Sequence, residues 1–186
     1  MDEFELIQKY FQRISNNNPS AKKLNDDVFF DKKSKLVVSV DTYNEGIHFP
    51  NFKHPNLVIK KILRSSISDL ISKGVKPKYY FLSGSGNKNQ FTKKNIKLIS
   101  KSLNQEQKKF SLKLSGGDTT NSSKVSFSLT SIGFSKKILE RNKAKLNDDI
   151  YVTGNIGDSF LGLKLIKNNI KINSELKNYF INQFYC

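Results

Sequence analysis

Two short apolar stretches of the sequence each run into an aspartate that is followed by threonine. Leu36–Val40 leads directly into Asp41, and Phe110–Leu114 leads into Asp118 through two glycines. Apolar runs of this length, rich in β-branched or alternating residues, indicate strands. Asp, Thr and Gly also end strands and begin turns in ordinary loops, so each stretch taken alone is compatible with turn chemistry. Their occurrence together indicates carboxylates at the ends of two strands of one sheet.

The other patterns predict an α+β domain, in which a mixed or antiparallel sheet is flanked by helices. Apolar residues at helical spacing predict a helix at residues 4–14 and a long helix from about residue 57, which Gly74 would end. Further strands are predicted at 28–30, 78–85 and 124–134, and a lysine-rich helix at 92–109.

A polar, charged segment at 138–148 is predicted to link this first domain, residues 1–137, to a second. Residues 150–154 predict a strand, and two helices are predicted to follow, the last from about Ser174. One strand and two helices do not close a core, so we expect residues 149–186 to begin a truncated α/β domain. Its apolar residues are expected to be partly exposed: Ile150, Val152, Leu161, Leu163, Leu165 and Ile166.

The net charge of the 186-residue chain is +16, but its lysines are spread along the whole sequence. This favours a solvated basic surface over a nucleic-acid site, and no zinc-finger or helix-turn-helix spacing is present. No window approaches the ~20 apolar residues of a membrane span, so we expect no membrane partner. The only cysteine, Cys186, excludes a disulfide within the chain. We therefore expect a cytoplasmic protein.

Four acidic sites stand apart in the sequence and carry the candidate chemistry. Asp27, preceded by Asp26, opens the first strand, Asp41 and Asp118 close two others, and Asp69 lies on the margin of a helix's apolar face. A partly buried carboxylate needs a partner, and a nearby lysine would serve for Asp69. If the carboxylates converge, their repulsion requires cations, and hard oxygen ligands from several elements suit Mg²⁺. Gly116 and Gly117 leave backbone N–H groups open to a phosphate.

The motifs in their order identify a family resemblance. They are "EFELIQKYF", "NDD", "SVDTYNEGIHF", "SISDLISKGVKPKYYFLS", "LSGGDTT", "SIGF" and "LERNKAKLNDDIYVTGNIGDSFLGL". The chain resembles thiamine-monophosphate kinase, of the superfamily of aminoimidazole ribonucleotide synthetase, over nearly its whole length and as the N-terminal portion only. The resemblance implies transfer of the ATP γ-phosphoryl group to thiamine phosphate, several Mg²⁺ ions, and a homodimer whose N-terminal sheets join into a barrel.

The resemblance also implies roles for individual residues. Asp27, Ser39, Asp41, Asp69 and Asp118 would hold the metals. Gly117, Asp118 and Arg141 would bind ATP, and His48 would contact thiamine phosphate. The chain departs from the family pattern at Asn25, where glycine is usual, at Val40, where threonine is common, and at Ser66, where asparagine is usual. These departures bear on the number and affinity of the metals.

Three other functions remain open at this point. They are an ATP-dependent enzyme of the same superfamily with a different acceptor, a non-catalytic dimerising module that binds nucleotides, and a nucleic-acid binder driven by charge. The family's usual chain carries a further Asp-rich motif in its second domain, which this sequence does not contain. We therefore expect the 186-residue chain alone to bind Mg·ATP weakly and to have little or no kinase activity.

Overall fold

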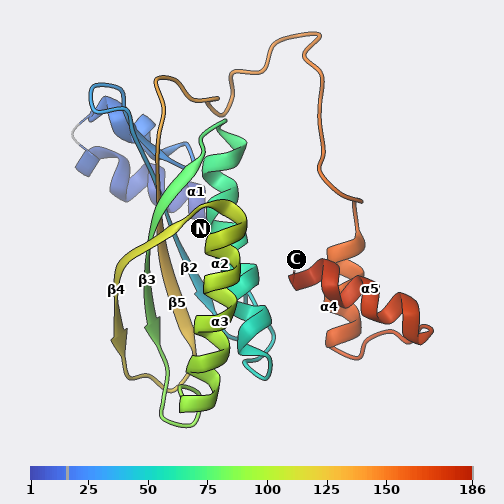
Figure 1. The fold of residues 1–186 in the computed structure, drawn as a ribbon. Coiled ribbons are helices and arrows are strands. Elements are labelled where there is room, and N and C mark those ends of the chain that lie inside the picture. Colours follow the sequence, from blue (N-terminus) through green and yellow to red (C-terminus); the bar gives the residue numbers. More distant parts are fainter. Residues whose placement is uncertain (16, 186) are drawn as a thin grey trace.

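A computed structural model describes residues 1–15 and 17–185, so Asn16 and Cys186 lie outside the described residues. Its centre is one five-stranded mixed sheet with the strand order β1-β2-β5-β3-β4 (Figure 1). The strands are β1 Phe29–Asp31, β2 Leu36–Asn44, β3 Pro77–Ser85, β4 Lys113–Thr120 and β5 Ser126–Phe134. Neighbouring strands are antiparallel except for β3 and β4, which are parallel and joined by a helix. The expected α+β class with a mixed sheet and flanking helices is confirmed.

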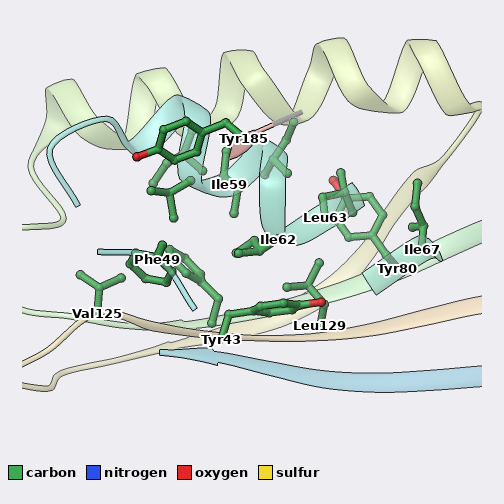
Figure 2. Close-up of a cluster of buried hydrophobic side chains, with 14 of the residues drawn as sticks. Tyr43, Phe49, Ile59, Ile62, Leu63, Ile67, Tyr80, Val125, Leu129 and Tyr185 are labelled. Atoms are coloured by element: carbon green, nitrogen blue, oxygen red, sulfur yellow. The ribbon is translucent and has the colours of Figure 1, made fainter. Parts of the chain in front are cut away.

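Two long helices, α2 (Pro55–Ser72) and α3 (Lys93–Phe110), cover one face of the sheet (Figure 1). Their positions agree with the predicted helices, because both carry apolar residues at helical spacing. Figure 2 shows residues of α2 lying over Tyr43, Tyr80 and Leu129 of the sheet. The fully buried side chains of α2 form the centre of this core: Val58, Ile59, Ile62, Leu63 and Ile67.

Helix α2 ends in a Schellman motif at the predicted glycine. Gly74 has φ +73°, its N–H donates to the carbonyl of Ile71, and the N–H of Val75 donates to the carbonyl of Leu70. Glycine adopts this left-handed conformation without a steric penalty, which explains why the helix ends here. The motif fixes Lys73, the last residue before Gly74, at the end of the helix.

The opposite face of the sheet carries exposed and half-exposed apolar side chains. Alternation along the strands directs Val40, Phe81 and Phe134 to this face, and they are 67%, 38% and 48% exposed. Val38 and Ile132 lie on the same face and are half-buried. We refer to these five residues as the open face.

The N-terminal segment is helical, as predicted, but it is irregular. It consists of α1 (Glu3–Leu6), a π-helical turn at Ile7–Phe11 and a 3₁₀ turn at Gln12–Ser15, followed by a kinked 3₁₀ segment at Pro19–Leu24. Its predicted apolar face is largely exposed. Among the described residues, none of the helices is both long and apolar enough to cross a bilayer.

The predicted strand at 150–154 is wrong. These residues form no strand, and Ile150, Tyr151 and Val152 are strongly exposed because no neighbouring strand pairs with them. The two predicted helices are present as α4 (Asp158–Ile166) and α5 (Ser174–Tyr185). Leu161 is exposed as expected, but Leu165 is buried.

The C-terminal helices α4 and α5 pack against each other, and α5 packs against α2. A Cβ atom at Gly162 of α4 would lie 2.0 Å from the carbonyl oxygen of Phe180, so the two helices approach closely there. Phe184 of α5 is buried in the core next to α2, and Lys61 donates to its carbonyl at 2.9 Å. Leu163 and Ile166 pack against the same core and are only partly buried. Residues at the end of the chain therefore contribute to the first core.

Candidate functional site

A serine and two aspartates meet where β2 passes beneath α2. Alternation along β2 turns Ser39 and Asp41 toward the helix, and Asp69 lies on the helix margin three residues after the buried Ser66. The Oγ atom of Ser39 donates to Oδ2 of Asp69 at 2.8 Å. Ser39 is 2% exposed and Asp69 is half-buried, so this hydrogen bond lies at the boundary between the core and solvent. Sequence reasoning named all three residues, and the structure brings them together.

The two carboxylates are half-buried and repel each other. Burial raises the pKa of Asp41, although hydrogen bonds from Ser66 and Tyr43 oppose the shift. Burial also raises the pKa of Asp69, the hydrogen bond from Ser39 opposes this rise, and the negative charges of Asp41 and Asp27 add to it. A pair of carboxylates that resists ionisation is a favourable place for a cation.

His48 lies beside this pair in the loop after β2. Its Nδ1 atom accepts the N–H of Asn44 at 2.9 Å, and its ring lies edge-on to Tyr43 with 5.6 Å between the centroids. The hydroxyl group of Tyr43 donates to Oδ2 of Asp41 at 3.3 Å. The exposed imidazole is thus fixed close to Asp41, with which it interacts electrostatically.

A second group of charges lies at the C-terminal end of α2. The ammonium group of Lys73 lies 2.7 Å from Oδ1 of Asp26 and 3.1 Å from Oδ2 of Asp27. The guanidinium group of Arg141 forms an ion pair with Asp27, and the backbone N–H of Arg141 donates to Oδ2 of Asp26 at 3.0 Å. Arg141 and Asp27, predicted to meet ATP and metal, are therefore in contact.

Next to these charges lies a cavity of about 520 Å³ whose lining carries four basic and two acidic side chains, the others being asparagine and proline. Such a lining attracts anions, and phosphate groups are the anions that the sequence analysis predicts. The residues that line it are Asn17, Asn18, Pro19, Lys22, Lys23, Asn25, Asp26, Glu140, Arg141, Asn142 and Lys143.

Asp118 and Gly117 lie far from these two groups. In the ladder, Asp118 aligns with Ser83, Ser128 and Thr42, so it is three strands from β2, about 14 Å at ~4.8 Å per strand. Asp118 shares the face of Thr42, whereas Asp41 points to the face covered by α2. The expectation that Asp41, Asp69 and Asp118 converge is thus wrong for Asp118 within one chain.

The expectation that Asp41 and Asp118 close their strands is also wrong. Strand β2 continues three residues past Asp41 to Asn44, and β4 continues past Asp118 to Thr120. Gly117 has a packing reason to be glycine, because a Cβ atom there would lie 1.8 Å from the carbonyl oxygen of Leu82. Strand β4 lies at the edge of the sheet and its residues are exposed, so a phosphate can approach the side of β4 that faces away from β3.

The donor chemistry of the first group fits Mg²⁺. Among residues 1–15 and 17–185, no set of three or more His, Cys, Asp and Glu side chains is arranged to hold a metal ion. Mg²⁺ commonly uses only one or two carboxylates and completes its shell with water and substrate phosphates. Asp41 and Asp69, with the Ser39 hydroxyl group, supply such a partial set.

Sequence reasoning missed Lys73 and Tyr43. A lysine directly before a helix-ending glycine is common on surfaces, and only the fold reveals that Lys73 is buried against two aspartates. Tyr43 lies two residues after Asp41 on β2. The period of two places both side chains on the same face, so the sequence could have revealed this neighbour.

Comparisons with known proteins agree with the motifs. The thiamine-monophosphate kinase of Buchnera aphidicola subsp. Acyrthosiphon pisum (strain APS) is 37% identical over 188 residues, covering 96% of this chain and 57% of that protein. The thiamine-monophosphate kinase of Bacillus subtilis (strain 168) is 32% identical over 192 residues, covering 98% of this chain and 59% of that protein. The chain thus spans less than two thirds of the length of these relatives.

Solved structures share the fold. Thiamine monophosphate kinase (ThiL) from Aquifex aeolicus superposes with a TM-score of 0.79 at 24% identity, covering 98% of this chain and 61% of that one. AaThiL complexed with AMPPCP and TMP gives a TM-score of 0.82 at 24% identity, with coverages of 98% and 60%.

A family assignment follows from these matches. Residues 25–135 match the family described as AIR synthase related protein, N-terminal domain. That range contains the whole sheet and both covering helices. The resemblance to thiamine-monophosphate kinases drawn from the motifs is confirmed, and the chain belongs to the AIR synthase-related family, with its N-terminal domain at residues 25–135.

Proposed function

We propose that this chain takes part in the ATP-dependent phosphorylation of thiamine phosphate to thiamine diphosphate. The proposal rests on the group formed by Ser39, Asp41 and Asp69, which lies where β2 meets α2. These residues fall within the range 25–135 that matches the family. It is supported by the names of the curated relatives and by the ligands of the structural neighbour, AMPPCP and TMP. AMPPCP is an ATP analogue, and thiamine phosphate is the acceptor that the motifs imply.

We assign the metal-binding role of the nucleotide-free chain to Asp41, Asp69 and Ser39, and we propose that Asp27 and, from β4, Asp118 join only when nucleotide is bound. Mg²⁺ bound to phosphate oxygens would neutralise the charge that develops during phosphoryl transfer. The side chains themselves perform two tasks. Ser39 orients the Asp69 carboxylate through its 2.8 Å hydrogen bond, and Tyr43 orients Asp41.

We assign the ATP phosphates to Arg141 and to the backbone around Gly117 and Asp118. Arg141 lines the cavity of about 520 Å³ and pairs with Asp27, and its planar guanidinium group suits bidentate recognition of phosphate. Phosphoryl transfer requires little covalent chemistry from the protein, so alignment and charge stabilisation are the contributions that these residues make. His48, which is exposed and held by Asn44, is assigned to thiamine phosphate.

We further propose that two copies of the chain form a dimer through the open face. Its exposed apolar residues Val40, Phe81 and Phe134 would be covered by the same face of a second sheet, which would give the barrel that the resemblance implies.

For the chain taken alone we propose weak Mg·ATP binding and little turnover. The distance of Asp118 from Asp41 in a single chain supports this. We propose a division into residues 1–137, a linker at 138–148 and a C-terminal part at 149–186, whose helix α5 packs against the core of the first part, and we propose the cytoplasm as the location.

Calorimetric titration of the purified chain tests the proposed function. We expect thiamine phosphate and Mg·AMPPCP to bind to the wild type, and binding of Mg·AMPPCP to fall at least about tenfold in Asp41→Asn. Binding of Mg·AMPPCP without any binding of thiamine phosphate would favour a superfamily enzyme with a different acceptor. Failure of both ligands to bind would contradict the proposal.

A further inference from the structure

A buried lysine already occupies the place of a cation beside two of the aspartates. The side chain of Lys73 is 7% exposed and that of Asp26 is 4% exposed, so their 2.7 Å ion pair is almost completely removed from solvent. Asp27, 32% exposed, shares the same ammonium group at 3.1 Å. Two adjacent carboxylates at a desolvated position are costly unless a positive charge lies between them.

The surrounding backbone holds Lys73 in this position. Lys73 is the last residue before Gly74 in the Schellman motif, and its carbonyl oxygen accepts the N–H of Leu139 at 3.1 Å. Its ammonium group contacts both carboxylates, at 2.7 Å from Asp26 and 3.1 Å from Asp27. Lys73 is thus held both at its backbone and at its ammonium group.

Lys73 also links the two charged groups of the site. Lys73 follows Asp69 by four residues at the end of α2, so the two residues lie on the same side of the helix. The part of the site near Asp41 and Asp69 has no ion pair of its own at salt-bridge distance among the described residues, while the part near Asp26 and Asp27 has Lys73 and Arg141. The carboxylates of Asp41 and Asp69 are therefore open to a cation, whereas those of Asp26 and Asp27 are already neutralised.

We infer that Lys73 is a positioning residue that serves as the resident cation of Asp26 and Asp27, so that a divalent ion reaches Asp27 only by displacing it. This inference rests on the proposed metal binding. In the absence of nucleotide, divalent ions then bind at Asp41 and Asp69 and leave Asp27 with Lys73. Lys73 therefore sets how many metal ions the site takes up.

Binding of Mn²⁺, counted by the electron paramagnetic resonance signal of the free ion, tests the inference without an activity assay. We expect Lys73→Met to bind one more Mn²⁺ than the wild type, or to bind it at least about tenfold more tightly. Without metal, Lys73→Met should melt at a lower temperature, and Mn²⁺ should restore much of the loss. Lys73→Arg should behave like the wild type because the charge is kept.

Lys76→Met is the matched control, because Lys76 is exposed and the substitution makes the same change in net charge. It should leave the number and affinity of Mn²⁺ ions unchanged. Equal Mn²⁺ binding by Lys73→Met and the wild type would overturn the inference and reduce Lys73 to a structural ion pair. Absence of Mn²⁺ binding in every variant would instead contradict the proposed metal site as well.

If Lys73→Met does not fold, Asp27→Asn in the wild-type background tests the inference instead. Asp26 still pairs with Lys73 in that variant, so no buried charge is left alone. The inference expects Asp27→Asn to bind the same number of Mn²⁺ ions as the wild type, since Asp27 is held by Lys73. Loss of one ion would show that Asp27 is a ligand despite the lysine and would overturn the inference.

Discussion

The hydroxyl group of Ser39 on β2 donates a hydrogen bond of 2.8 Å to the carboxylate of Asp69 on α2. The two residues are 30 positions apart in the sequence and come from different secondary structure elements. This contact joins the sheet to its covering helix at the point where a second carboxylate, Asp41, faces the same helix. The fold therefore maintains a repulsive pair of carboxylates at a place where packing alone would favour apolar residues.

The first prediction concerns Asp41→Asn. Because burial and nearby carboxylates raise the pKa of Asp41, the ionised side chain destabilises the metal-free fold, and its neutral isostere should stabilise it. We expect a gain of about 0.5–2 kcal/mol in the unfolding free energy at pH 7 in chelator, with loss of Mn²⁺ binding. Denaturant unfolding measures this. Asp149→Asn, at an exposed position, is the charge-matched control and should change neither quantity.

The second prediction concerns pH. Carboxyls with a higher pKa in the fold than in the unfolded chain bind protons more tightly in the fold, so their contribution to stability falls as pH rises from 3.8 through the raised value. The protein that carries both Asp41→Asn and Asp69→Asn does not lose stability in this way as pH rises. Its stability advantage over the wild type should grow as pH rises through that window and then stay level. A constant difference from pH 4 to pH 7 would show that the two carboxyls are not perturbed.

The third prediction concerns the ion pair between α2 and α3. Glu106 is 3% exposed and accepts two hydrogen bonds from Arg64, at 2.6 and 3.0 Å. Glu106→Gln removes the buried negative charge that binds Arg64 and should cost about 3 kcal/mol of unfolding free energy. Adding Arg64→Met should cost less than the sum of the two single effects, because both substitutions remove the same ion pair. A simple sum of the two single effects would mean that the residues are not coupled.

The fourth prediction concerns Gly117→Ala. The new Cβ atom would overlap the carbonyl oxygen of Leu82 and push β4 away from β3. We expect a loss of about 2 kcal/mol or more in unfolding free energy, together with faster amide hydrogen exchange in β4. Gly116→Ala is the adjacent control, since its Cβ atom would meet only the Phe81 ring at 3.0 Å. Equal losses for the two variants would contradict the argument from the backbone overlap.

The fifth prediction concerns the proposed dimer. Val40→Lys places a charge in the centre of the open face and should shift sedimentation from dimer to monomer, with at least about a tenfold rise in the dissociation constant. Ile47→Lys adds the same charge at an exposed residue of the loop after β2 and should leave the dimer intact. A wild-type chain that sediments as a monomer at micromolar concentration would refute the dimer itself.

Local patterns account for the helices and for much of the sheet. The apolar residues of α2 and the glycine after Lys73 determine where that helix lies and where it ends, so sequence reasoning could place both. The same reasoning placed a strand at residues 150–154, because Tyr and Val favour strands locally. A strand needs a neighbour, and a local pattern does not reveal that none pairs with Ile150 or Val152 in this chain.

The position of Asp118 could not be read from local alternation for a different reason. Leu114 pairs with Tyr80, but Gly116 pairs with Phe81, so Ser115 is an extra residue in β4. A one-residue bulge moves every later side chain to the other face of the sheet. Alternation counted from Leu114 would place Asp118 on the helix-covered face, whereas the bulge places it on the opposite one.

The strand order has a consequence for how the chain folds as it is synthesised. Strand β5 is made last, yet it lies between β2 and β3 and pairs with both. Until Phe134 has left the ribosome, the β1–β2 hairpin and the β3–α3–β4 unit have no strand that joins them. Closure of such a sheet depends on contacts between distant residues, which form slowly. The nascent chain therefore exposes the β1–β2 hairpin with a free edge until β5 is made, and it is in this interval that chaperone binding would protect it most.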